Sequence, residues 1–186
     1  NKFYSIPTSN IAYEFTRKIY EVLGLDIECI ASKFTSYDLL SIKKIDVNGK
    51  LTDNIDYERI KCVLSQKKIF SEIELDDVIN ENEVEKMKFD AIVGNPPYQE
   101  NIGSTLNKSL SKQLYPIFMM SAIKMNPKYL SLITPSRWFT GNAQDRSFVL
   151  LREFLKKNNH FSHITNYLNS NDVFVDVSIP GGVNMF

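Results

Sequence analysis

Asn95, Pro96, Pro97 and Tyr98 follow one another directly after an apolar run that ends at Gly94. Each proline removes a backbone N–H donor and restrains the residue before it to an extended geometry. The expected result is a stiff loop that presents carbonyl oxygens, one amide side chain and one ring. The Asn95 side-chain oxygen and a neighbouring proline carbonyl can both accept hydrogen bonds from one NH₂ group, while Tyr98 offers a face for stacking.

This arrangement suits methylation of an exocyclic amine. Two acceptors on the amine hydrogens would draw the nitrogen toward a pyramidal nucleophile without a strong base. A Pro-Pro turn is also an ordinary way to end a strand, but the four letters should occur by chance in fewer than about one in a thousand chains of this length. Open α/β sheets bind ligands at the carboxyl ends of their strands, so the loop stands where a site is expected.

The elements that must position this loop alternate between strands and helices. We expect strands at 27–31, 89–94 and 129–134, helices at about 10–23, 53–68, 113–125 and 148–157, and three closing strands at 163–168, 173–179 and 183–186. Alternation of this kind predicts an α/β fold with a parallel sheet that helices cover on both faces. The closing run predicts an antiparallel hairpin at the edge of that sheet.

Composition excludes several classes of protein. The chain has 186 residues, 43% of them hydrophobic and 24% charged, which fits one domain or most of one and excludes a wholly disordered chain. No apolar run approaches the roughly 18 residues of a membrane span, and no secretion signal is present, so no membrane partner is expected. Cys29 and Cys62 lack the spacing of a metal site and predict reduced core thiols of a cytoplasmic protein.

Basic residues are concentrated in one stretch of an otherwise neutral chain. The whole sequence has 22 Lys and Arg against 22 Asp and Glu, but residues 104–160 hold nine bases and two acids. Such a segment is compatible with a polyanion on one face. Charge alone favours the alternative that these side chains cover solvated helix faces.

The sequence FDAIVGNPPYQ, residues 89–99, resembles the catalytic motif of S-adenosylmethionine-dependent N6-adenine DNA methyltransferases, particularly those of type II restriction–modification systems. The likeness continues in order through residues 115–118, 129–138 and 173–183. The resemblance implies a Rossmann-like class I methyltransferase sheet, S-adenosylmethionine as cofactor and double-stranded DNA as partner. The implied reaction moves a methyl group to the N6 amine of an adenine that is rotated out of the duplex.

The resemblance also assigns roles to individual residues. Asn95, Pro96, Pro97 and Tyr98 match the catalytic motif, in which the Asn side chain and the first Pro carbonyl hold the amine. Phe174 matches the ring that stacks, together with Tyr98, on the flipped base. By periodicity alone, a Phe on an expected strand is more often a core residue.

Other matched residues lie outside the motif. Asp38 matches the acid that binds the adenine amine of the cofactor, although its residue type alone would predict a turn or cap. Arg137 and Trp138 follow a strand end and are candidates for DNA contact, with core packing an equal alternative for Trp138. His160 and His163 have no ligand partners at metal-site spacing, so no metal is expected.

Two features depart from the family pattern. No Gly-x-Gly loop for the cofactor is present, and Ile6-Pro7-Thr8 stands where the family places an acid for the ribose hydroxyls. Glu14 lies one helix turn beyond that position. We therefore interpret residues 1–186 as a partial catalytic domain truncated at both ends. The first strand and glycine-rich loop would lie upstream and a target-recognition domain downstream, in the rest of the parent polypeptide, which argues against cofactor binding by this stretch alone.

Two alternatives keep part of this interpretation. An N5-glutamine protein methyltransferase or an RNA base methyltransferase would use the same Asn-Pro-Pro-Tyr loop, because a Gln side chain also presents an NH₂ group. A catalytically inert DNA-binding or assembly module would explain the missing glycine loop and the basic segment.

Overall fold

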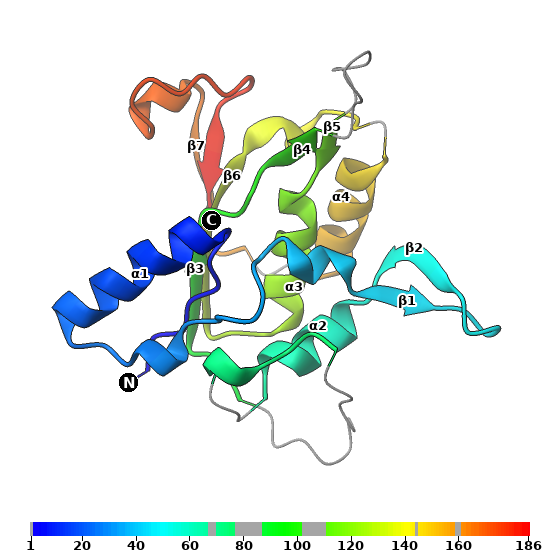
Figure 1. Cartoon of the computed structure of the whole chain (residues 1–186). Coiled ribbons are helices and arrows are strands. Elements are labelled where there is room, and N and C mark those ends of the chain that lie inside the picture. Colours follow the sequence, from blue (N-terminus) through cyan, green and yellow to red (C-terminus); the bar gives the residue numbers. More distant parts are fainter. Residues whose placement is uncertain (1, 67–69, 77–86, 102–110, 144, 159–160) are drawn as a thin grey trace. The chain divides into compact units, whose positions relative to one another are not determined.

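The computed structural model describes residues 2–66, 70–76, 87–101, 111–143, 145–158 and 161–186 (Figure 1). The chain divides into two compact units, Asn1–Lys88 and Phe89–Phe186. Within the described ranges, the helices are all too short or too polar to cross a membrane.

Where it is described, the first unit contains two helices, a β-hairpin and three short 3-10 helices. These are α1 (Asn10–Leu23), α2 (Tyr57–Leu64), β1 (Lys43–Ile45), β2 (Leu51–Ile55), η1 (Ile27–Cys29), η2 (Asp38–Ser41) and η3 (Phe70–Glu72). The strands β1 and β2 pair antiparallel. Apolar side chains from these elements form the core, with Ile30, Val63 and Ile73 completely buried.

Helix α1 forms where the sequence predicts it. The Ser9 side chain accepts a hydrogen bond from the Ala12 amide at 3.2 Å, and the helix ends at Gly24, whose φ of 66° is left-handed. Such caps satisfy backbone groups that the helix itself leaves unpaired.

One prediction in this unit is wrong, and a second is confirmed only in part. Residues 27–31 do not form a strand, because the Asp26 carboxylate accepts from the Glu28 amide at 3.1 Å and turns the chain into η1. Only an isolated parallel bridge between Ser5 and Ile30 remains. The expected helix at 53–68 begins only at Tyr57, because residues 51–55 are extended by their pairing with β1.

The second unit is built on a four-stranded sheet with the spatial order β3-β6-β8-β7. Its strands are β3 (Ala91–Gly94), β6 (Tyr129–Pro135), β8 (Val183–Met185) and β7 (Thr165–Tyr167). β3 and β6 are parallel, while β8 is antiparallel to both β6 and β7. β3, β6 and β7 therefore all run in the same direction.

Helices connect these parallel strands. α3 (Tyr115–Lys124) lies between β3 and β6 in the sequence, and α4 (Ser147–Lys157) between β6 and β7. The two helices pack against each other, and α3 also packs against β6. A second hairpin, β4 (Gln99–Asn101) with β5 (Ser111–Gln113), precedes α3. The α/β class is confirmed, as are the strands expected at 89–94 and 129–134 and the helices expected at 113–125 and 148–157.

The closing antiparallel hairpin has two strands rather than three. Residues 173–179 were expected to form a strand, but they curl around the side chain of Ser170 instead. The Ser170 hydroxyl donates to the Val177 carbonyl at 2.6 Å and accepts from the Ile179 amide at 2.9 Å. Ser170 itself opens η5 (Ser170–Asp172), and Asp176 has a φ of 61°, which a strand does not allow. Period-two patterning cannot reveal this local competition for backbone groups.

A row of polar side chains joins the strands of this sheet. Thr134, Asn184 and Asn166 are direct neighbours in the register of β6, β8 and β7. The Asn184 amide donates to the Thr134 carbonyl at 3.2 Å, and Thr134 donates to the Asn184 side-chain oxygen at 3.3 Å. Ser136, the residue that follows β6, donates to the side-chain oxygen of Asn166.

Gly182 allows β8 to enter the sheet. A Cβ at this residue would lie 2.1 Å from the Tyr167 carbonyl oxygen, and its φ is 75°. We expect Gly182→Ala to lower the free energy of unfolding by about 3–5 kcal/mol, because a backbone atom must move. Thermal or denaturant unfolding measures this loss.

Gly181→Ala is the matched control. Its φ is also positive, at 87°, but the nearest atom to a new Cβ is the flexible Arg137 Cγ at 3.2 Å. Only backbone strain of about 1–2 kcal/mol is expected. Equal losses in the two variants would contradict the close approach of Gly182 to β7.

Candidate active site

One edge of the second unit's sheet gathers the sequence-predicted residues. Because β3, β6 and β7 run parallel and β8 runs against them, the carboxyl ends of the first three strands and the start of β8 share this edge. The segments that leave it are 95–98 after β3, the 3-10 helix η4 (Ser136–Phe139) after β6, and 168–182 between β7 and β8. They carry Asn95, Pro96, Pro97 and Tyr98 on the first, Arg137 and Trp138 on the second, and Phe174 on the third.

The Asn95–Tyr98 loop presents its polar end outward. Asn95 is exposed, whereas Pro96, Pro97 and Tyr98 are half-buried. The Tyr98 carbonyl accepts from the Leu114 amide at 3.0 Å, and the chain then enters β4. The loop is thus fixed at its far end, and the Asn95 side chain is accessible to a ligand.

The Tyr98 ring rests against a second tyrosine. The ring centroids of Tyr98 and Tyr115 are 6.3 Å apart with an interplanar angle of 81°, an edge-to-face contact. Burial raises the pKa of Tyr98 to about 12. Its hydroxyl is buried and has no hydrogen-bond partner among the described residues. The ring is therefore neutral at physiological pH, and its polar end is the buried one.

Tyr115 was missed by the sequence reasoning as a site residue. It is completely buried, and its ring also contacts Phe148, with ring centroids 5.8 Å apart. Burial raises the pKa of Tyr115, and the positive charge of Arg137 opposes this to a lesser extent. The Trp138 backbone also favours the charged form, although no described group meets the geometry of a hydrogen bond to this hydroxyl. An apolar helix start gives no sequence signal for such a contact.

Helix η4 places Arg137 and Trp138 in different environments. Arg137 is exposed, whereas Trp138 is buried and packs on Phe139, with ring centroids 4.4 Å apart, and on Phe161 at 6.3 Å. These surroundings agree with the packing alternative for Trp138, and its contact with DNA stays a prediction.

Arg152 on α4 stabilises the turn formed by η4 and the residues that follow it. Its guanidinium donates to the carbonyls of Trp138 and Gly141, each at 2.8 Å. A charged donor shared by two carbonyls fixes the turn more firmly than neutral hydrogen bonds would. The basic stretch thus includes a structural arginine that charge counting could not separate from its neighbours.

Phe174 lies on the 168–182 segment, not on a strand. The side chain is half-buried, and the backbone amide donates to the Ser170 carbonyl at 2.8 Å. The structure therefore places Phe174 at the same sheet edge as Tyr98, within a turn.

The first unit contains a pocket of about 430 Å³. It is formed by the start of α1 and the segment that leads into η2, and it is lined by Pro7, Ser9, Asn10, Tyr13, Glu14, Ala31, Ser32, Lys33, Phe34, Thr35 and Asp38. Carboxylates and aromatic rings line it together, so it can accept hydrogen bonds from an amine while an apolar surface contacts the ring that carries it.

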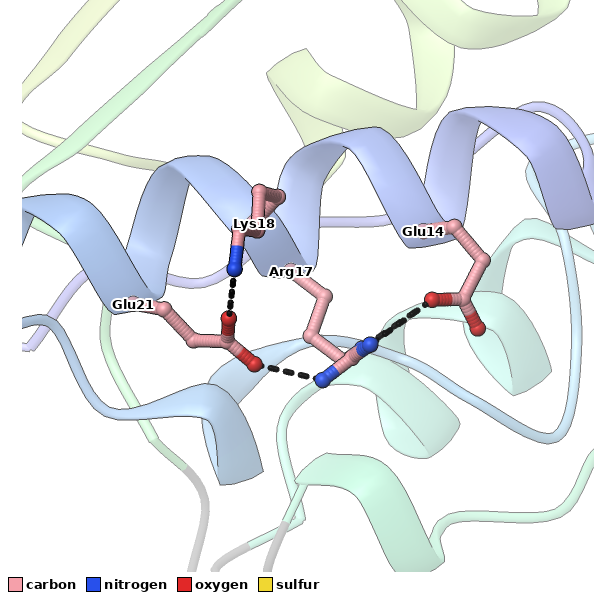
Figure 2. A network of polar contacts seen from close by, with 4 residues as sticks. All are labelled: Glu14, Arg17, Lys18 and Glu21. Carbon is pink, nitrogen blue, oxygen red and sulfur yellow. Dashed lines mark hydrogen bonds and ion pairs between the residues drawn. The ribbon is translucent and has the colours of Figure 1, made fainter.

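Asp38 and Glu14 both face this pocket. One oxygen of Asp38, Oδ2, accepts from the Thr35 amide at 2.7 Å and its hydroxyl at 2.8 Å, and a carboxylate retains further acceptor capacity. Glu14 is held by Arg17, which also contacts Glu21 (Figure 2). Asp38 thus stabilises a turn, as its residue type predicts, and also lines the pocket.

Metal ligation finds no support in the described part of the chain, where no three His, Cys, Asp or Glu residues are grouped closely enough to hold an ion. His163 contacts the Thr165 hydroxyl at 3.0 Å, and His160 lies outside the described residues. Cys29 and Cys62 are buried free thiols, as predicted.

The stiff acceptor loop lies at the carboxyl end of a parallel strand, where open α/β sheets bind their ligands. The sequence profile of the Eco57I restriction-modification methylase family matches residues 2–174. The chain therefore belongs to the Eco57I restriction-modification methylase family, which confirms the resemblance to adenine methyltransferases.

A curated relative gives the same indication. A protein of Mycoplasma pneumoniae (strain ATCC 29342 / M129 / Subtype 1), described as an uncharacterized adenine-specific methylase, is 39% identical over 100 residues. The match covers 54% of this chain and 23% of that relative. The chain therefore matches about a quarter of the length of this relative.

Burial of Tyr98 predicts a pH dependence of stability. The folded chain holds the phenol proton to about pH 12, above the ordinary pKa of 10.0, so the unfolded chain releases it first. The contribution to the free energy of unfolding is complete below about pH 10 and is lost as the pH rises through about 12. Tyr98→Phe should therefore lose less stability than the parent over this window.

Denaturant titrations at about pH 9 and at half-unit steps above it would measure the difference. Identical pH dependence in the parent and in Tyr98→Phe would contradict the burial of this hydroxyl.

Proposed function

We propose that this chain is part of an adenine-specific DNA methyltransferase of a restriction–modification system. It would transfer a methyl group from S-adenosylmethionine to the N6 amine of a flipped-out adenine. The observation that carries the proposal is the exposed Asn95 side chain in a stiff Pro-Pro loop, at the sheet edge that Phe174 shares. Family membership and the printed description of the relative support it.

The proposed chemistry needs positioning and polarisation rather than a strong base. The Asn95 side-chain oxygen and the Pro96 carbonyl accept from the two amine hydrogens, which makes the nitrogen lone pair available for attack. Pro97 keeps Pro96 extended, and this restraint fixes the direction in which the Pro96 carbonyl accepts from the amine. Tyr98 and Phe174 stack on the two faces of the base and replace the stacking that it loses on leaving the duplex.

The cofactor proposed for this reaction is S-adenosylmethionine, whose sulfonium supplies the methyl group. The first unit's pocket suits its adenine end, because Asp38 can accept from the adenine amine and Phe34 offers an apolar wall. Glu14 lines the same pocket. Residues 6–8, where the family places an acid for the ribose hydroxyls, include no acid in this chain.

We further propose that the fold is a Rossmann-like class I methyltransferase sheet, completed by chain outside residues 1–186. The strand order β3-β6-β8-β7, with β8 alone antiparallel, supports this assignment. β3 pairs on one side only among the described residues, so the backbone groups of its other edge are available to an additional strand. The glycine-rich loop and target-recognition domain would belong to the same parent polypeptide, for which we propose a cytoplasmic location.

A first prediction separates the role of the amine-binding loop, Asn95–Tyr98, from that of the cofactor pocket. In the parent polypeptide, Asn95→Ala should lower methyl transfer to DNA by about 100-fold or more, as loss of one preorganised polar contact at a reacting centre does. S-adenosylmethionine affinity should stay unchanged. Asp38→Ala is the counterpart and should weaken S-adenosylmethionine binding by calorimetry.

Radioactive methyl transfer to unmethylated DNA, with protein and RNA as competing substrates, measures the rate. Methylation by Asn95→Ala at the parent rate would show that Asn95 does not hold the target amine. Transfer to a glutamine side chain or to RNA would favour the alternative methyltransferases, and absence of any transfer would favour the inert module.

A second prediction concerns the stacking rings. Tyr98→Ala and Phe174→Ala should each weaken duplex binding or methylation by roughly 5- to 150-fold, the equivalent of about 1–3 kcal/mol of stacking per base. A mismatch opposite the target adenine should partly restore both variants, because less energy is needed to unpair the base.

Duplex titrations paired with thermal melts test each variant. Suppose that Phe174→Ala lowers the melting temperature while its loss of duplex binding is the same for a paired and a mismatched adenine. That result would show that Phe174 is a packing residue and not part of the proposed site.

A further inference from the structure

Tyr98 is attached to the start of α3 at two points. Its carbonyl accepts from the Leu114 amide at 3.0 Å, and its ring stands edge-to-face against Tyr115 at 6.3 Å. Leu114 and Tyr115 are both completely buried, and Pro116 restrains the first turn of α3. The Tyr98 ring therefore packs against a part of the structure that is itself held in place.

We propose that Tyr115 is a positioning residue for Tyr98. Its ring sets the orientation at which the Tyr98 ring meets the target base, without itself touching the base. This inference rests on the proposed function, because it gives Tyr98 the stacking role.

The contact acts through the ring of Tyr115. Its hydroxyl has no partner among the described residues at ordinary hydrogen-bond geometry, and the Trp138 backbone is a polar influence on it. Its ring is in contact with the rings of both Tyr98 and Phe148. Edge-to-face pairs have an energy beyond that of the area they bury, and they prefer a defined interplanar angle. An aliphatic side chain would fill the space but would not select that angle.

A double-mutant cycle in the parent polypeptide tests this role. Tyr115→Leu should lower kcat for DNA methylation by about 2- to 13-fold, the rate equivalent of an aromatic pair, with the KM for S-adenosylmethionine unchanged. In a Tyr98→Ala background the same change should have less than about a 2-fold effect, since the ring to be positioned is gone. Tyr115→Phe, which keeps the ring, should recover most of the rate that Tyr115→Leu loses.

Phe148→Leu is the matched control. Phe148 is also completely buried, and its ring also contacts that of Tyr115. Its substitution should lower the melting temperature about as much as Tyr115→Leu does. Its effect on kcat should be the same with and without Tyr98, because a purely structural loss is not coupled to the base-stacking ring.

Equal factors for Tyr115→Leu in the two backgrounds, or no recovery in Tyr115→Phe, would overturn the positioning role. The NMR shifts of the Tyr98 ring protons provide a readout that does not depend on activity, and they should change in Tyr115→Leu more than in Phe148→Leu. If the parent methylates no DNA, the proposed function fails and the base-positioning role fails with it. Unchanged ring shifts with an active parent would overturn the role of Tyr115 alone.

Discussion

The insertion of β8 between β6 and β7 is the constraint on which the second unit depends. Because β8 runs against both neighbours, β6 and β7 must run in the same direction, which is also the direction of β3. Three strand ends therefore open on one edge. The insertion requires close backbone contact at Gly182, where no side chain would fit against the Tyr167 carbonyl.

The polar row across this sheet stabilises the same arrangement. Asn184 and Thr134 are completely buried, and a buried amide without partners would be unfavourable by about 1–3 kcal/mol. Their mutual hydrogen bonds form only in the register in which Thr134 lies opposite Asn184. A slip of β8 by one residue would break these bonds and turn its side chains to the opposite face. The row therefore favours one register, and with it one placement of the 168–182 segment.

The proposed function divides the work between the two units. The first unit would bind the cofactor's adenine through Asp38, and the second would hold and stack the reacting base through Asn95, Tyr98 and Phe174. Each unit uses short-range turns for this purpose: Thr35 bonds to Asp38 in one, and Ser170 organises the backbone around Phe174 in the other. The side chains to which we assign these roles thus project from turns that local hydrogen bonds fix.

The sequence by itself determined the α/β class, the Asn-Pro-Pro-Tyr loop after a strand, and the family. These depend on short-range properties: apolar periodicity, the stiffness of two prolines and a run of letters rare by chance. It failed at 27–31, 53–56 and 173–179, where a cap, a hairpin partner or a serine hydroxyl took the backbone hydrogen bonds. Only the tertiary structure placed Tyr115 against Tyr98, and the Phe174 segment at the same edge of the sheet as the loop that follows β3. These placements involve residues distant in sequence, and the strand order that produces them leaves no trace in local patterns.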